Sequence, residues 1–451
     1  MSTMIRRLTV SLLMAAVFTV AVPVATFQLQ RSTPRIQFTD TRLENGLRVI
    51  IAEDRSAPVF SIVVNYNVGS RDERKGRTGF AHFFEHMMFK GSANVGPGEH
   101  PYLMFMYGGN MNGTTSKDRT VYYETLPANQ LDLALFLEAD RMRSLEITRE
   151  NLENQRNAVQ EERRLGVDNQ PYGRSFEVRD ELAYDNAAYE HSVIGSMADL
   201  NAATVEDVAA FFKTYYAPNN AVVAIVGDVE TKTTLEKMRK HFGSIPRQQP
   251  PPPVDMTEPL QTAERRTSID DPLARLPRLD MAYKIPPGDA PDTDALGVLA
   301  SILSGGRSSR FNEAIVRQKQ LSPGVFAGAA EMRGPGLFTI NGVAAPGRTL
   351  ADLEAAIDAE IENIKEAPIA DWEIEKARTS ARSALVGNLG SSLSRAMSLS
   401  QYALFYDKPD KINTRAEDIA KVTAADVQRV ARRYLVPAGR TVVVTMPKGG
   451  K

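Results

Sequence analysis

A pattern that recurs 219 positions later constrains the fold of this chain more than any other feature. The first copy contains Thr204, Asp207, Tyr215, Pro218 and the apolar run 221–226. The second copy contains Thr423, Asp426, Tyr434, Pro437 and the run 441–445. Each copy is typical of an N-capped helix, a proline turn and then a strand. A recurrence without gaps predicts two related halves of about 220 residues each.

The stretch between the two copies is rich in proline, with four consecutive prolines at 250–253. Such a composition predicts an extended linker. We therefore expect a first domain over residues 33–246, a linker over 247–261 and a second domain over 262–451. The net charge of −1 gives no reason to expect a nucleic acid as partner.

The N-terminal segment has the composition of a targeting signal. Arg6 and Arg7 precede an apolar run over residues 8–24, and small residues follow it. This order predicts a secretory signal peptide over residues 1–25, cleaved after Ala21 or Ala25. We expect an exported, periplasmic protein, with an uncleaved membrane anchor as the alternative. The chain has no cysteine, so it forms no disulfide.

The pentapeptide 82–86 reads H-x-x-E-H, a spelling typical of zinc sites. Each residue advances about 100° around a helix, so His82, Glu85 and His86 share one arc. The other side of that helix is apolar: Phe80, Phe83, Phe84, Met87 and Met88. An apolar helix is a buried helix, and a buried polar arc needs a partner. We expect a divalent metal held by the two imidazoles, with Glu85 as the general base. The competing interpretation is a polar stripe on a surface helix.

A third ligand must come from elsewhere in the chain. Residues 150–164 predict a charged helix that carries Glu161 and Glu162, and Glu162 lies 76 positions after His86. Either carboxylate could complete the site, and the pair could also be a solvated acidic face. Residues 262–451 contain no histidine, so the second half cannot hold a histidine-based zinc site.

The chain resembles the pitrilysin/insulinase family of inverted zincins, in the branch that includes mitochondrial processing peptidase and its bacterial homologues. The motifs that carry the resemblance are 82–86, Glu162 at the family spacing, Pro171-Tyr172-Gly173, Tyr216-Ala217-Pro218-Asn219-Asn220, and Gly305-Gly306-Arg307-Ser308-Ser309-Arg310. The resemblance implies an α+β protein with two homologous α/β-sandwich domains. It also implies one zinc ion per chain with His82, His86 and Glu162 as ligands and Glu85 as base.

The resemblance places further residues near the zinc. Asn112 matches an asparagine on an edge strand where the substrate backbone pairs. Gly113 follows where the family often has alanine, so we expect a looser edge. Gln155 stands where many members carry a glutamate that supports a ligand, and a neutral amide would still form hydrogen bonds there.

The second half departs from the pattern of active members, which need an arginine and a tyrosine near the scissile bond. Arg317 is present, but Pro323 occupies the tyrosine position. We therefore expect a heterodimer with a homologous chain that lacks H-x-x-E-H and supplies both residues. The alternative is a homodimer in which Tyr283, or a group of the facing chain, replaces the tyrosine.

The predicted function is that of a zinc-dependent endopeptidase subunit that hydrolyses peptides or unfolded polypeptide segments. Two alternatives are a non-catalytic structural subunit and a dedicated processing factor for one protein.

Overall fold

The computed structural model describes residues 35–448, so the predicted signal peptide lies outside the described residues. Within the described residues, no helix combines the length and apolar character that crossing a membrane requires. Residues 246–262, which include the four prolines, form neither helix nor strand.

The first sheet holds six strands in the order β1-β2-β6-β3-β5-β4. Their bounds are β1 (Thr39–Arg42), β2 (Arg48–Glu53), β6 (Ala221–Gly227), β3 (Val59–Tyr66), β5 (Thr120–Pro127) and β4 (Asn110–Thr115). β2 and β6 are parallel, and the other neighbours are antiparallel. The predicted Asn45-Gly46 turn joins β1 to β2, and Gly46 has a φ of 91° there, which favours glycine.

The second sheet repeats this connectivity with five strands in the order β7-β11-β8-β10-β9. Their bounds are β7 (Arg265–Asp271), β11 (Arg440–Pro447), β8 (Arg278–Ile285), β10 (Gly336–Val343) and β9 (Val325–Ala329). The pair β7–β11 is parallel, as β2–β6 is in the first sheet. The fold prediction of two related α+β halves is therefore confirmed.

The repeated motif occupies equivalent places in the two halves. Thr204 caps α8 (Val205–Tyr215) and Thr423 caps α15 (Ala424–Tyr434), each through a side-chain oxygen that accepts from the third helical amide. The strands that follow are β6 and β11. The remaining helices are α1 (Phe80–Met87), α2 (Glu99–Met106), α3 (Leu131–Ser144), α4 (Arg149–Arg163), α5 (Gly173–Ala183), α6 (Ala187–Glu190), α7 (Met197–Ala202), α9 (Thr231–Phe242), α10 (Thr293–Ser304), α11 (Leu350–Glu366), α12 (Asp371–Asn388), α13 (Ser392–Tyr406) and α14 (Lys411–Lys421).

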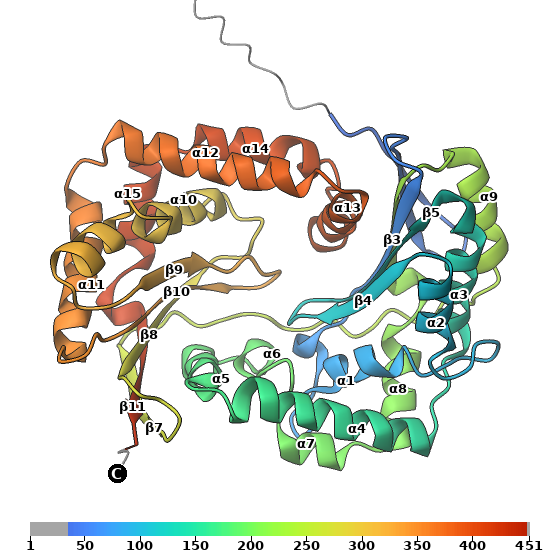
Figure 1. Ribbon diagram of the computed structural model, residues 1–451, viewed down its shortest axis with the longest axis horizontal. Helices are drawn as coiled ribbons and strands as arrows, with labels where there is room; N and C mark the ends of the chain where they lie inside the picture. The colour runs from blue at the N-terminus through green and yellow to red at the C-terminus, as the bar shows by residue number, and fades with distance from the viewer. Residues whose placement is uncertain (1–34, 449–451) are drawn as a thin grey trace, which may run out of the picture. The chain divides into compact units, whose positions relative to one another are not determined.

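Each sheet is covered on one face by helices of its own half and on the other by helices of the other half. Helix α13 of the second half lies beside the first sheet (Figure 1). There, Val63 and Ala224 of the sheet pack against Leu399 and Ala403 of α13. On the second sheet, Ala282 and Leu337 pack against a cluster from α5 and α6 that includes Tyr184 and Tyr189. Each half therefore contributes helices that cover the sheet of the other half and complete its hydrophobic core.

Candidate active site

The loop before helix α1 provides the group that caps its N-terminus. Its N-cap is Gly79, whose φ of 87° is left-handed and which has no side chain to cap the helix. The Glu73 carboxylate takes over this role and accepts hydrogen bonds from the amides of Gly79 (2.8 Å) and Ala81 (2.7 Å). A carboxylate at a helix N-terminus also interacts favourably with the helix dipole. The start of α1, two residues before His82, is thus fixed.

Helix α1 has a buried apolar side and a less buried polar side, as predicted. Phe80, Phe83, Phe84 and Met87 are buried in the core of the first half. His82 and His86 are partly exposed and lie beside α4, with their ring centroids 4.9 Å apart. The polar side of α1 therefore faces α4, and its two imidazoles are only partly open to solvent.

Glu162, near the end of α4, faces both imidazoles. Its Oε2 lies 3.3 Å from His86 Nε2 and 3.6 Å from His82 Nε2. Glu161 turns instead to Arg164, at 3.0 Å. Donor atoms of His82, His86 and Glu162 all lie within 4.8 Å of one another. The structure therefore brings together the residues that the resemblance selected, and it leaves Glu161 out.

The chemistry of this donor set fits a zinc ion. Burial, together with the smaller effect of the neighbouring His86, lowers the pKa of His82 to about 4. Burial also lowers the pKa of His86. Both rings are therefore neutral near pH 7, which is the form that binds a metal, and the carboxylate supplies the third donor type that zinc accepts.

Gln155 lies beside His86. Its side chain is buried and opposes the fall in the pKa of His86, while its amide donates to Asn154 Oδ1 at 2.5 Å. A hydrogen bond to the second ring nitrogen orients a ligating histidine and selects its tautomer. The role of Gln155 in supporting a zinc ligand stays a prediction.

Glu85 is buried between α1 and β4. The Thr115 hydroxyl donates to Glu85 Oε2 at 2.6 Å. A Cβ on Gly113 would lie 2.9 Å from Glu85 Cγ, so the missing side chain leaves room for the glutamate. Burial raises the pKa of Glu85 above its usual value, although the Thr115 hydrogen bond opposes this. Gly113 is buried against Glu85, and the expectation of a looser edge stays a prediction.

The strand β4 lies at one end of the first sheet and pairs only with β5 among the described strands. Asn112 on β4 is exposed, and its side-chain oxygen accepts a hydrogen bond from the Gly113 amide at 2.8 Å. An open strand edge can add an extended peptide as a further strand. Thr115 was not among the predicted site residues. Its signal is the strand period of two, which puts it on the same face as Gly113.

The second-half residues lie elsewhere. Arg317 is exposed on a π-helix, Asn312–Gln318, and forms an ion pair with Glu313 at 2.5 Å. Among the described residues, no hydrogen bond or ion pair joins it to the His82 site. Pro323 is exposed in the loop before β9. Tyr283 is buried in the second core, so the alternative in which its hydroxyl serves the substrate is wrong.

A second cluster of donor groups was not predicted. His100, Glu124 and Glu138 are buried within 4.8 Å of one another, and His100 Nε2 lies 2.5 Å from Glu124. The buried Arg141 pairs with Glu138 and lies 4.0 Å from Glu124. The Arg141 guanidinium supplies a positive charge there, and the cluster joins α2, α3 and β5.

Comparison with known proteins agrees with this geometry. The family model described as "Insulinase (Peptidase family M16)" matches residues 48–196, and the "Peptidase M16 inactive domain" model matches residues 202–381. The zinc protease PqqE of Helicobacter pylori is 30% identical over 90% of this chain and 92% of its own length. A probable mitochondrial-processing peptidase subunit beta of Arabidopsis thaliana is 26% identical, over 88% of this chain and 76% of its own.

A solved structure supports the same grouping. The crystal structure of a protease from Helicobacter pylori superposes with a TM-score of 0.87 and 29% sequence identity. It covers 91% of this chain and 100% of its own. Together with the match over nearly the full length of PqqE, these likenesses decide the family. The chain belongs to peptidase family M16, the pitrilysin/insulinase family.

Proposed function

We propose that this chain is the zinc-bearing subunit of an endopeptidase that hydrolyses peptides or unfolded polypeptide segments. One observation carries the proposal: two neutral imidazoles and the Glu162 carboxylate converge on one point, with the buried Glu85 beside them. The zinc protease names of several relatives support it.

Each residue has a separate role in this proposal. His82, His86 and Glu162 would hold one zinc ion, which when bound acts as a Lewis acid and makes water more acidic. Glu85 accepts a proton from the attacking water and delivers it to the leaving amine nitrogen. Its raised pKa suits both steps, because a general base works best with a pKa near the working pH. The open edge of β4 holds the peptide extended beside Glu85.

The first prediction separates the base from the ligands. Glu85→Gln keeps the shape of the side chain but removes the base, so zinc content stays near one per chain and peptide cleavage is lost. Glu162→Gln weakens zinc binding strongly. Glu161→Gln is the matched control and leaves zinc content unchanged, because Glu161 faces Arg164.

The measurements are zinc content by atomic absorption and cleavage of a quenched peptide library. Loss of zinc in Glu85→Gln would show that this residue is a ligand and not the base. Zinc content near one per chain without cleavage, in every pairing with homologous chains, would favour a non-catalytic structural subunit. Cleavage of a single protein, with the peptide library untouched, would favour a dedicated processing factor.

A further inference from the structure

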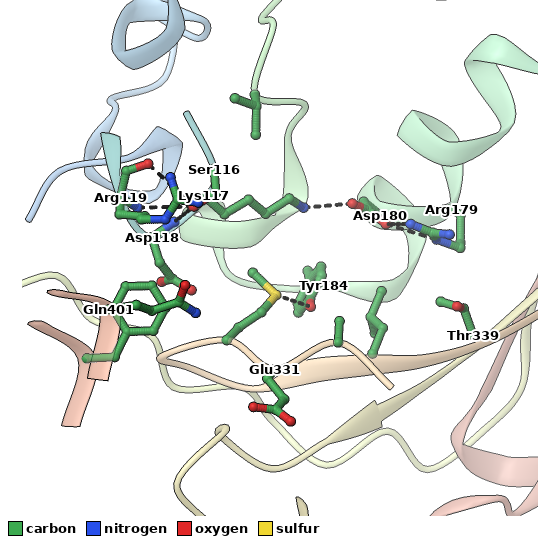
Figure 2. A pocket seen from close by; sticks show the side chains of 15 residues that line it. Ser116, Lys117, Asp118, Arg119, Arg179, Asp180, Tyr184, Glu331, Thr339 and Gln401 are labelled. Carbon is green, nitrogen blue, oxygen red and sulfur yellow. Dashed lines mark hydrogen bonds and ion pairs between the residues drawn. The ribbon is translucent and has the colours of Figure 1, made fainter. Parts of the chain in front are cut away.

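A cavity of about 480 Å³ lies at the tip of the β4–β5 hairpin. Its walls come from this hairpin, from α5, from the turn between β9 and β10, and from α13 (Figure 2). Both halves of the chain therefore build it. The hairpin that contributes to its wall is the one whose outer strand, β4, carries Gly113 and Thr115 beside Glu85.

The acidic groups in the wall already have partners. Asp118 accepts from Arg71 at 2.8 Å, and Asp180 accepts from Lys117 at 2.7 Å and from Arg179. Glu331 forms an ion pair with Arg415, which lies behind the wall. None of these carboxylates is left to attract a cationic ligand.

Arg119 differs from the other cations of the wall. Its guanidinium donates to the Thr114 carbonyl at 3.2 Å, and among the described residues no carboxylate lies within ion-pair distance of it. Burial lowers the pKa of Arg119, while the charges of Glu85, Tyr123 and Asp118 oppose this effect without an ion pair. A largely desolvated guanidinium without a carboxylate favours an anionic ligand, because a buried charge is costly until it is paired.

The position of Arg119 relates the cavity to a peptide on β4. Gly113 and Thr115 meet Glu85 on one face of the hairpin. Arg119 instead contacts Thr114, whose side chain points to the opposite face because successive residues alternate. A peptide added to the edge of β4 would project every second side chain to the Arg119 face. Side chains located near the Thr115 end of the strand would then reach the cavity.

We propose that this cavity is a substrate subsite in which Arg119 binds a carboxylate of the peptide. The inference rests on the proposed peptidase function. In an antiparallel pairing the residues beyond Thr115 lie on the N-terminal side of the scissile bond, so the ligand is an acidic side chain there. In a parallel pairing they lie on the C-terminal side, where an acidic side chain or the terminal carboxylate fills the same place.

The test measures equilibrium binding to the full-length zinc-loaded chain carrying Glu85→Gln. Fluorescence anisotropy compares labelled peptides of one sequence that carry Glu or Gln at each position in turn, with a free or amidated C-terminus. We expect one Glu position, or the free C-terminus, to bind about tenfold more tightly than its neutral counterpart, as for a charge-assisted hydrogen bond. The position that responds identifies the source of the carboxylate.

Variants then assign the effect to Arg119. Arg119→Gln removes the Glu-over-Gln difference, and Arg119→Lys retains part of it. The matched control is Arg348→Gln, which removes an equal charge at an exposed position before α11. Equal binding of all Glu and Gln peptides to the chain with Arg119 intact would overturn the inference, even if Arg119→Gln does not fold. An equal loss in Arg348→Gln would overturn it as well.

Cleavage by the chain with Glu85 intact separates this inference from the proposed function. Cleavage without any carboxylate preference overturns the subsite alone. A carboxylate preference that Arg119→Gln removes supports the subsite, even where no cleavage occurs and the peptidase proposal fails.

Discussion

Two residues of β4 decide where the Glu85 carboxylate points. Thr115 holds Oε2 through its hydroxyl at 2.6 Å, and Gly113 leaves the space that the side chain crosses. A general base must lie within hydrogen-bond reach of the proton that it takes, so a small rotation of Glu85 is costly for the reaction. Thr115 is therefore a positioning residue in the proposed mechanism.

The second prediction tests this role. Thr115→Val is nearly isosteric and removes only the hydroxyl. A hydrogen bond to a charged group contributes about 1.5–3 kcal/mol, so we expect kcat to fall about tenfold or more. Zinc content and thermal stability stay close to those of the unaltered protein, and Thr115→Ser restores most of the rate. An unchanged kcat in Thr115→Val would mean that the contact does not position the base.

Local helical geometry explains which site residues could be predicted. His82, Glu85 and His86 share one arc because of the helix period alone, and the structure places them so. The sequence pattern alone did not decide whether Glu161 or Glu162 is the third zinc ligand. The resemblance to the family selected Glu162. Thr115 and Arg119 belong to a hairpin that meets α1 only in the folded chain, so no local pattern relates them to Glu85.

At the scale of elements, α1 depends on a contact between distant loops. Glu73 caps the helix, and His191 Nε2 lies 2.9 Å from the same carboxylate. Burial alone would lower the pKa of His191, but the hydrogen bond and charge of Glu73 outweigh it, and the net shift is upward. The protonated His191 thus stabilises the cap on the helix that carries the zinc motif.

The third prediction follows from the sign of that shift. A pKa raised in the folded state gives a stabilisation that is fully present below the unfolded pKa, near 6.5, and is lost as pH rises through the folded value. His191→Gln should therefore destabilise the protein at pH 6, by about 1.5–3 kcal/mol, and less at pH 9. Thermal unfolding of both proteins at the two pH values measures this. An equal loss at both values would contradict the assignment.

The helix–strand repeat was predictable because capping residues and apolar runs are local signals, as Thr204 and Thr423 show. The position of α13 was not. Its apolar residues, such as Leu399, fit any buried face, and only the folded chain shows that they cover β3 and β6 of the other half. Similarly, side chains alternate with a period of two in edge strands and in central strands alike. The sequence therefore did not show that β4 is an edge strand.

For the whole molecule, the exchange of helices makes the halves interdependent. Without the second half, the first sheet would expose the face that contains Ile50, Val63 and Ala224. Burial of side chains as large as Ile50 and Val63 contributes about 1.5–3 kcal/mol each, which is large compared with the net stability of a domain.

The fourth prediction is that residues 33–246 and 262–451, produced separately, do not unfold cooperatively, whereas the two pieces produced together do. Circular dichroism during heating, with size-exclusion chromatography of the mixture, provides the measurement. A cooperative transition of residues 33–246 alone, with zinc bound, would show that α13 is dispensable for the fold of the first half.

The last prediction concerns a partner chain. The resemblance implies that active members have a tyrosine in the second half at the position of Pro323, and Tyr283 of this chain is buried. Loss of one donor that stabilises the developing oxyanion typically costs about 10²–10³ in rate. We therefore propose that this chain binds zinc by itself but cleaves peptides well only with a homologous chain that lacks H-x-x-E-H and supplies an arginine and a tyrosine.

The assay compares this chain alone, the candidate partner alone and their mixture, each with its zinc content. We expect activity to rise on mixing by about the factor that one such donor contributes. The Tyr→Phe variant of the partner should remove most of that rise while zinc binding here stays unchanged, because the tyrosine contributes only to the reaction. Full activity of this chain alone, unaffected by the partner, would instead favour a homodimer in which a group of the facing chain replaces the tyrosine.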